Sequence, residues 1–124
     1  SKKINQDIDL ICGTPYGAVS YASYISITNN IPMIFLRKEQ KNHGTKKMIE
    51  GNYETNNKVV LIEDVTTTGS SVFEAIYILE KHGLKVTQII TIISRHINEE
   101  LYYNDTLVEY LYHINDINNT KTFF

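Results

Sequence analysis

The chain has 124 residues, of which 42% are hydrophobic, and its formal net charge at pH 7 is -2. This length suits one domain, and the charge gives no bulk attraction to nucleic acid. The nine tyrosines lack the interleaved basic residues of a nucleic-acid platform. We find no signal peptide, and no apolar run approaches the roughly 18 residues of a membrane span. The single cysteine, Cys12, suits a reducing compartment. We therefore expect one cytoplasmic domain over residues 1–124 that binds neither nucleic acid nor membranes.

Short apolar segments alternate with helical patterns along most of the chain. The segments expected to form strands are 8–12, 33–36, 59–62 and 86–93. Helices are expected at 18–28 and 71–82. The second helix has an apolar face at helical spacing and is followed by Gly83, which is typical of a helix stop. This alternation predicts a mostly parallel sheet flanked by helices.

The pattern weakens after residue 93. Residues 101–103 are compatible with an edge strand, and residues 106–114 with a final helix capped by Asp105. We expect the tail from about residue 115 to be loosely held. His82 falls at a helix end and His113 in a polar tail, and neither has a second metal ligand at helical spacing. A zinc site is therefore not expected.

The segment 59–71 carries the strongest functional signal. Its apolar start predicts a strand covered on both faces, which delivers Glu63 and Asp64 to the carboxyl edge of the sheet, where α/β folds bind ligands. These carboxylates suit ribose hydroxyls or a hydrated Mg²⁺. Hydroxyl side chains then surround Gly69 just before a helix, a typical anion site: Thr66, Thr67, Thr68, Ser70 and Ser71. The simpler alternative is a helix cap made by Ser70 or Ser71. A nucleotide P-loop is excluded because it needs a lysine before the final hydroxyl residue.

Two further segments are chemically suggestive. The turn 13–17 follows the first strand and contains two glycines, which let backbone N–H groups approach an anion; an ordinary strand-to-helix turn is the alternative. Residues 37–51 contain five basic residues against Glu39 and Glu50, a local excess of +3. This segment is long for a connection in a compact domain, which favours a binding loop or lid, although most charge runs are simply solvated.

Three stretches together resemble the orotate phosphoribosyltransferases, and most of all the transferase part of the fusion enzyme UMP synthase. They are residues 9–18, 31–47 and 59–71. The last stretch alone would indicate any phosphoribosyltransferase. The pattern Arg37-Lys38-Glu39-x-Lys41-x-His43-Gly44 narrows the resemblance to orotate enzymes. The resemblance implies an α/β fold, the Rossmann-like type I phosphoribosyltransferase fold with a central mostly parallel sheet.

The resemblance also implies a reaction and a site. The ribose 5-phosphate of 5-phospho-α-D-ribose 1-diphosphate (PRPP) would pass to N1 of orotate, with Mg²⁺ held mainly by PRPP rather than by a protein cage. The residues expected to bind PRPP are Thr14, Tyr16, Arg37, Lys38, Lys41, His43, Glu63, Asp64, Thr66, Thr67, Thr68, Gly69, Ser70 and Ser71. Those expected to act in catalysis are Lys38, Lys41, His43 and Asp64. Thr67 and Arg95 would meet orotate. A homodimer with shared active sites is implied, because the family's basic loop reaches into the neighbouring subunit.

The acceptor side is less fully matched than the PRPP side. Only eight residues precede Asp9, whereas the family has a longer segment there that forms part of the orotate pocket, so we expect an abbreviated pocket. The sequence after the predicted base-side strand, Ser94-Arg95-His96-Ile97-Asn98, also departs from the family pattern. Two alternatives stay open: a transferase for another base, and a non-catalytic PRPP-binding regulatory module.

Overall fold

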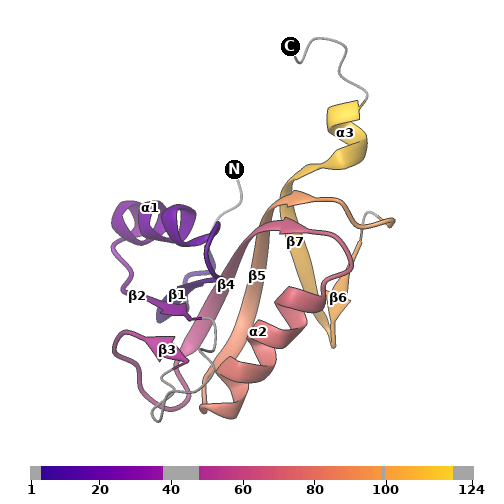
Figure 1. Ribbon diagram of the computed structural model, residues 1–124. Coiled ribbons are helices and arrows are strands. Elements are labelled where there is room, and N and C mark those ends of the chain that lie inside the picture. Colours follow the sequence, from indigo (N-terminus) through magenta and orange to yellow (C-terminus); the bar gives the residue numbers. More distant parts are fainter. Residues whose placement is uncertain (1–3, 38–47, 99, 119–124) are drawn as a thin grey trace.

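A mixed seven-stranded sheet organises the chain. The computed structural model describes residues 4–37, 48–98 and 100–118. The strand order is β3-β2-β1-β4-β5-β7-β6 (Figure 1). The strands are β1 Leu10–Gly13, β2 Met33–Leu36, β3 Ile49–Glu50, β4 Lys58–Thr66, β5 Lys85–Ser94, β6 Tyr102–Tyr103 and β7 Thr106–His113. The five inner strands run parallel, and the two short edge strands β3 and β6 are antiparallel to their neighbours.

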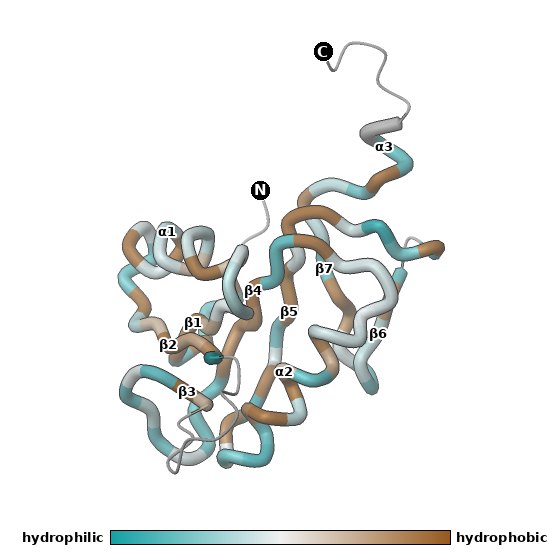
Figure 2. The backbone as a smooth tube through the Cα atoms, in the orientation of Figure 1, coloured by the Kyte–Doolittle hydropathy of each residue, from teal (hydrophilic) through white to brown (hydrophobic). Residues whose placement is uncertain are grey.

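Two helices cover opposite faces of this sheet. They are α1 Val19–Asn29 and α2 Ser70–Lys81, and a short α3 follows at Ile114–Asn118. Successive side chains of β4 point to opposite faces. Leu61 accordingly packs in the cluster under α2, and Ile62 in the cluster with Ala22 of α1. Hydrophobic residues concentrate along β1, β4 and β5 in Figure 2. The predicted parallel sheet, covered on both faces, is thus confirmed.

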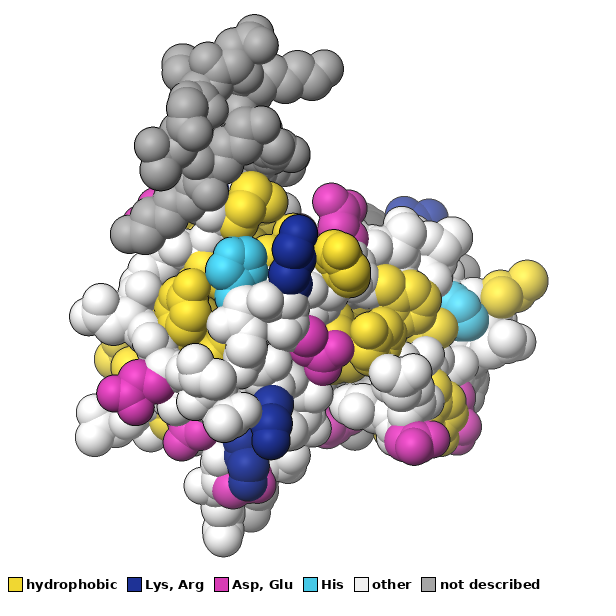
Figure 3. Space-filling view, turned by 90° about the horizontal axis from the view of Figure 1, so that it is seen from below, with side chains coloured by type: hydrophobic (Ala, Val, Ile, Leu, Met, Phe, Trp, Pro, Cys, Tyr) yellow, Lys and Arg dark blue, Asp and Glu magenta, His cyan; other side chains and the backbone are white. Residues whose placement is uncertain are grey.

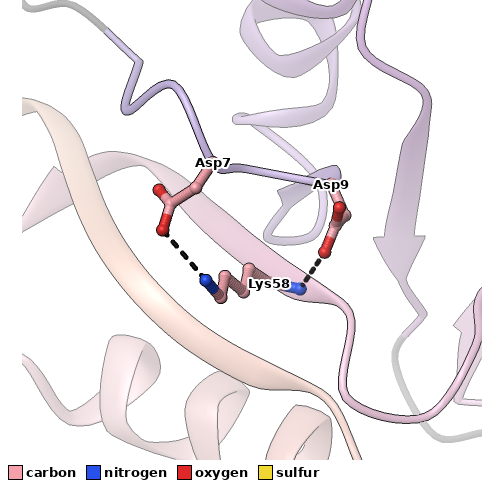
Figure 4. Close-up of polar contacts among 3 residues, drawn as sticks. All are labelled: Asp7, Asp9 and Lys58. Carbon is pink, nitrogen blue, oxygen red and sulfur yellow. Dashed lines mark hydrogen bonds and ion pairs between the residues drawn. The ribbon is translucent and has the colours of Figure 1, made fainter.

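The N-terminal segment is tied to the start of β4 by Lys58. Its backbone N–H donates to Oδ2 of Asp9 at 2.8 Å, and its Nζ lies 3.1 Å from Oδ2 of Asp7 (Figure 4). This hydrogen bond and the nearby positive charge lower the pKa of Asp7. These contacts align β1 with β4, and they thereby help to fix where the first turn leaves the sheet.

The C-terminal prediction was wrong in part. Residues 106–113 form strand β7, not a helix, and β7 pairs in parallel with β5. Asp105 lies in the turn between β6 and β7, next to Asn104 with φ of 52°, and caps no helix. The segment is rich in β-branched and aromatic residues, and pairing with β5 buries its Val108. His113 ends this strand and is 1% exposed, so it does not lie in a polar tail.

Other boundaries differ less. The expected edge strand at 101–103 is confirmed as β6 Tyr102–Tyr103. Strand β4 continues through the two carboxylates to Thr66, and β3 is a strand that the sequence did not indicate. Helix α3 occupies the start of the expected loose tail, whose residues 119–124 lie outside the described part.

The described helices include none that is both long and apolar enough to cross a membrane. On the face seen from below in Figure 3, acidic and basic side chains are interspersed rather than gathered by sign.

Candidate active site

The carboxyl ends of the parallel strands bring the predicted site segments together. Gly13 at the end of β1 pairs with Ile62, and Thr66 at the end of β4 pairs with Ser94. A cavity of about 550 Å³ opens at this edge. The residues lining it are Thr14, Pro15, Leu36, Arg37, Met48, Glu63, Asp64, Val65, Ser71, Glu74, Ala75 and Ile78. This is the edge at which ligands bind in open α/β folds.

Glu63 joins three segments of the site. Its Oε1 accepts hydrogen bonds from the Thr14 hydroxyl at 2.7 Å and from the Asp64 backbone N–H at 3.0 Å. Its Oε2 accepts a hydrogen bond from the Ser71 hydroxyl at 2.8 Å. We call Thr14, Glu63 and Ser71 the Glu63 junction. It connects three segments: the turn at residues 13–17 after β1, which we call the first turn, the end of β4, and the N-terminal end of α2.

Burial governs the ionisation of Glu63. The residue is 4% exposed, and this desolvation raises the pKa of its carboxyl group, with a further raising contribution from Asp64. The hydroxyls of Thr14 and Ser71 act in the opposite direction, because their hydrogen bonds stabilise the charged form. The junction therefore offsets part of the cost of burying a carboxylate beside another carboxylate.

Asp64 is placed differently from its neighbour. It is half-buried and lines the cavity, and its Oδ1 accepts a hydrogen bond from the Val65 backbone N–H at 2.8 Å. A Cβ atom on Gly17 would overlap Oδ2 of Asp64. The first turn thus lies directly against this carboxylate, and any larger residue at position 17 would require the Asp64 side chain to move. Of the two predicted carboxylates, Asp64 is the more accessible to a ligand.

The loop from Thr66 to Ser71 leads into α2 without a conventional cap. Gly69 is the N-cap residue with φ of 90°, and no side chain caps α2 by a hydrogen bond. The alternative of a cap made by Ser70 or Ser71 is therefore wrong. The Ser71 hydroxyl donates to Glu63 instead, and the Ser70 backbone N–H makes a long hydrogen bond of 3.4 Å to the Thr68 hydroxyl. The first N–H groups of a helix lack partners within it, so they are open to an anion.

Thr66 carries a second unpaired polar group in this loop. The residue is 2% exposed, and its Oγ1 has no hydrogen-bond partner among the described residues. A buried hydroxyl without a partner is costly, and such groups in native proteins call for a functional explanation. The unpaired hydroxyl and the start of α2 belong to one short loop.

Of the remaining predicted residues, Arg37 lines the cavity. Tyr16 is 58% exposed and follows a cis Pro15–Tyr16 peptide bond. The guanidinium of Arg37 lies 2.9 Å from Oε1 of Glu50. The backbone N–H of Arg95 donates to the Thr66 carbonyl at 2.6 Å, which places Arg95 beside the loop at residues 66–71. The exposed Thr67 and Thr68 lie in that loop, while Lys38, Lys41 and His43 fall outside the described residues.

Sequence reasoning missed the roles of Gly17 and His113. Gly17 was noted only as a turn residue, and its contact with Asp64 depends on the pairing of β1 with β4. His113 was assigned to a tail, and no sequence signal could have placed it in the interior, because its burial follows from the pairing of β7 with β5 and burial along β7 shows no period of two.

A mostly parallel α/β sheet with a carboxylate at its carboxyl edge and a hydroxyl-rich loop before a helix is typical of proteins that bind sugar phosphates. Comparison with known families makes this specific. Residues 1–117 match the phosphoribosyl transferase domain, and the chain belongs to that family. Its fold is the type I phosphoribosyltransferase fold, as expected from the sequence.

Individual relatives agree with this assignment. The orotate phosphoribosyltransferase of Pyrococcus horikoshii is 44% identical over 95 residues, which are 77% of this chain and 51% of that protein. The uridine 5'-monophosphate synthase of Bos taurus is 43% identical over 89 residues, covering 72% of this chain and 18% of that protein. The chain thus spans about half the length of the Pyrococcus relative.

Solved structures show the same likeness. The UMP synthase of Leishmania donovani superposes with a TM-score of 0.77 and 33% identity, covering 89% of this chain and 24% of that one. The orotate phosphoribosyltransferase of Aeropyrum pernix also gives a TM-score of 0.77, with 26% identity, covering 90% of this chain and 66% of that one.

Proposed function

We propose that this chain is the PRPP-binding and transferring part of an orotate phosphoribosyltransferase. The reaction would move ribose 5-phosphate from PRPP to N1 of orotate, giving orotidine 5'-phosphate and pyrophosphate, a step of pyrimidine biosynthesis. The observation that carries the proposal is the Glu63 junction, which joins the first turn and the start of α2 around one cavity beside Asp64. The names of relatives at 41–44% identity support orotate as the acceptor.

The chemistry asks the protein mainly for charge stabilisation. When pyrophosphate departs, positive charge develops on the sugar ring and negative charge on the leaving oxygens. Asp64 would stabilise the ring and hold its hydroxyls, while the Glu63 carboxylate holds the surrounding segments in place. The loop from Thr66 to Ser71, with the backbone N–H groups at the start of α2, would bind the 5-phosphate. Fixed donors and charges of this kind act without reorganisation during the reaction.

The first turn would bind the diphosphate. Thr14 lines the cavity, and Tyr16 follows it in the same turn. No group of three or more metal-ligating side chains occurs in residues 4–37, 48–98 and 100–118. The residues present fit a Mg²⁺ that takes most ligands from PRPP and water, because Asp64 offers an accessible carboxylate at the cavity. When bound, Mg²⁺ would neutralise the leaving diphosphate.

The basic segment would close over the diphosphate. Arg37 lines the cavity at the point where this segment begins. Lys38, Lys41 and His43 would neutralise the leaving group, and Lys41 or His43 would donate a proton to it. We further propose a homodimer in the cytoplasm, in which this segment reaches the partner's site.

Arg95 and Thr67 would bind orotate. The Arg95 backbone is fixed to the Thr66 carbonyl, and its guanidinium makes no ion pair with a described residue. A cation presented from a fixed backbone suits the carboxylate of orotate. The departure of residues 94–98 from the family pattern favours a second candidate, a transferase for another base.

Turnover with defined substrates tests the proposal. The protein is mixed with PRPP, Mg²⁺ and orotate, and both the loss of orotate absorbance and the release of pyrophosphate are followed, with adenine, hypoxanthine and uracil as alternative acceptors. Release that depends on orotate supports the proposal, and release with another base alone supports the second candidate. Tight PRPP binding by calorimetry without turnover would instead indicate a regulatory binding module.

A further inference from the structure

His113 ends strand β7 beside the candidate acceptor side of the site. Its backbone pairs with Ser94 at the end of β5, so it lies at the same sheet edge as Arg95. The side chain is 1% exposed, and the ring of Tyr110 packs edge-on against it at a centroid distance of 5.4 Å. The mechanism proposed above does not use this buried imidazole.

The hydrogen bonds of His113 define a single neutral tautomer. The backbone N–H of Asn115 donates to Nδ1 at 3.1 Å. Because a backbone N–H can only donate, Nδ1 must be unprotonated, and Nε2 must carry the proton. That Nε2 lies 3.1 Å from the carbonyl oxygen of His96, so His113 donates a hydrogen bond to the segment that follows β5.

This hydrogen bond fixes the segment that carries Arg95 from its C-terminal side. On the N-terminal side, the Arg95 backbone N–H donates to the Thr66 carbonyl at 2.6 Å. Local hydrogen bonds add to these two attachments: the His96 backbone N–H donates to the Ser94 hydroxyl at 3.4 Å, and the Asn98 backbone N–H donates to Nδ1 of His96 at 3.2 Å. The exposed Arg95 side chain thus projects from a backbone held at both ends.

We propose that His113 is a positioning residue for the acceptor base: by donating Nε2–H to the His96 carbonyl, it holds the backbone of Arg95 at the angle needed to meet an anionic acceptor. This inference rests on the proposed function for its effect on catalysis. The effect should fall mainly on the acceptor side: although the Arg95 backbone also bonds the Thr66 carbonyl, the PRPP side is held together by the Glu63 junction, in which His113 takes no part. Loss of the hydrogen bond should therefore weaken acceptor binding and leave PRPP binding nearly unchanged.

Three variants test this role. His113→Leu removes both hydrogen bonds, whereas His113→Gln keeps an N–H donor of similar reach for the His96 carbonyl. Val108→Ala is the matched control, because Val108 is 5% exposed on the same strand but pairs with Ile89, away from the edge. We expect His113→Leu to raise KM for orotate about tenfold, the scale of one hydrogen bond, with KM for PRPP changed less than about twofold.

The control and the conservative variant separate positioning from stability. His113→Gln should recover most of the orotate KM, and Val108→Ala should lower the unfolding midpoint without changing the ratio of the two KM values. Equal increases in both KM values for His113→Leu, no increase in either, or no recovery in His113→Gln would overturn the proposal.

A second readout does not depend on turnover. Nitrogen NMR of the imidazoles in the wild-type protein should show His113 with Nε2 protonated and Nδ1 unprotonated at neutral pH, and amide exchange at His96 and Asn98 should quicken in His113→Leu but not in Val108→Ala. An imidazolium, the other tautomer, or unchanged exchange would refute the positioning role. If these results hold while orotate is not a substrate, the proposed function fails and the positioning of the Arg95 segment stands.

Discussion

Thr14→Val isolates one hydrogen bond of the Glu63 junction. The side chain keeps its β-branched shape but loses the hydroxyl that lies 2.7 Å from Oε1 of Glu63, in a residue that is 3% exposed. A hydrogen bond to a charged group contributes about 1.5–3 kcal/mol to stability. With an unfolding entropy of roughly 2.1 cal/mol/K per residue, a 124-residue chain has about 0.26 kcal/mol/K, so the melting temperature should fall by about 6–12 °C.

The pH dependence of this effect tests its cause. The Thr14 hydroxyl lowers the pKa of Glu63, so its loss should raise that pKa further above the usual 4.5. The destabilisation should be greatest at a pH where Glu63 is charged in the folded protein and should shrink as the carboxyl is protonated. Thermal unfolding by circular dichroism at a series of pH values measures both quantities.

Thr87→Val provides the matched control, because Thr87 is exposed on β5 and its hydroxyl has no described hydrogen-bond partner. It should change stability by less than about 0.5 kcal/mol. Equal melting temperatures for Thr14→Val and the wild type at every pH in the series would refute the reasoning. A loss that did not vary with pH would show that packing, rather than the carboxylate, is responsible.

Four further outcomes are expected. Because burial raises its folded-state pKa, Glu63 binds its proton more tightly when folded, so wild-type stability should fall by up to about 1.4 kcal/mol per pH unit above 4.5 until the folded group ionises. Glu63→Gln should remove that fall in urea titrations run at several pH values. Gly69→Ala should destabilise by about 1–3 kcal/mol in the same assay, because Gly69 has φ of 90° and a Cβ there would lie 2.9 Å from Leu101 Cδ2; an unchanged midpoint would contradict this. The buried Cys12, whose pKa is raised to about 12, should resist thiol reagents until the protein unfolds, and rapid labelling of the native protein would show otherwise. Lys41→Ala should reduce turnover about 10²–10³-fold if that lysine stabilises the leaving group, and an unchanged rate would exclude it from the lid.

The parts of the fold that the sequence predicted are those with an unambiguous period. The apolar run 59–62 and the amphipathic face of α2 each allow one interpretation, and both elements were confirmed. Residues 106–113 failed because a short segment of mixed apolar and polar residues is compatible with either period, and pairing with β5 decided the outcome. The local pattern of apolar and polar residues does not reveal a tertiary pairing of this kind.

The candidate site divides in the same way. The residue types in segment 59–71 indicated a sugar-phosphate site because their chemistry is local. The sequence could not show that Glu63 is buried and Asp64 is accessible, since this difference depends on which residues from other segments pack against each carboxylate. Ser71 of α2 donates a hydrogen bond to Glu63, and Gly17 lies against Asp64.

The junction also has a consequence for folding kinetics. Thr14 and Glu63 are 49 residues apart in the chain, so their contact requires the non-local pairing of β1 with β4. Closing a loop of that length carries an entropic cost that is repaid only when the core around β4 is in place. The sheet edge that carries the Glu63 junction should therefore form late in folding, after the central strands have paired. A bound sugar phosphate should then slow unfolding by favouring the native state, while leaving the refolding rate nearly unchanged.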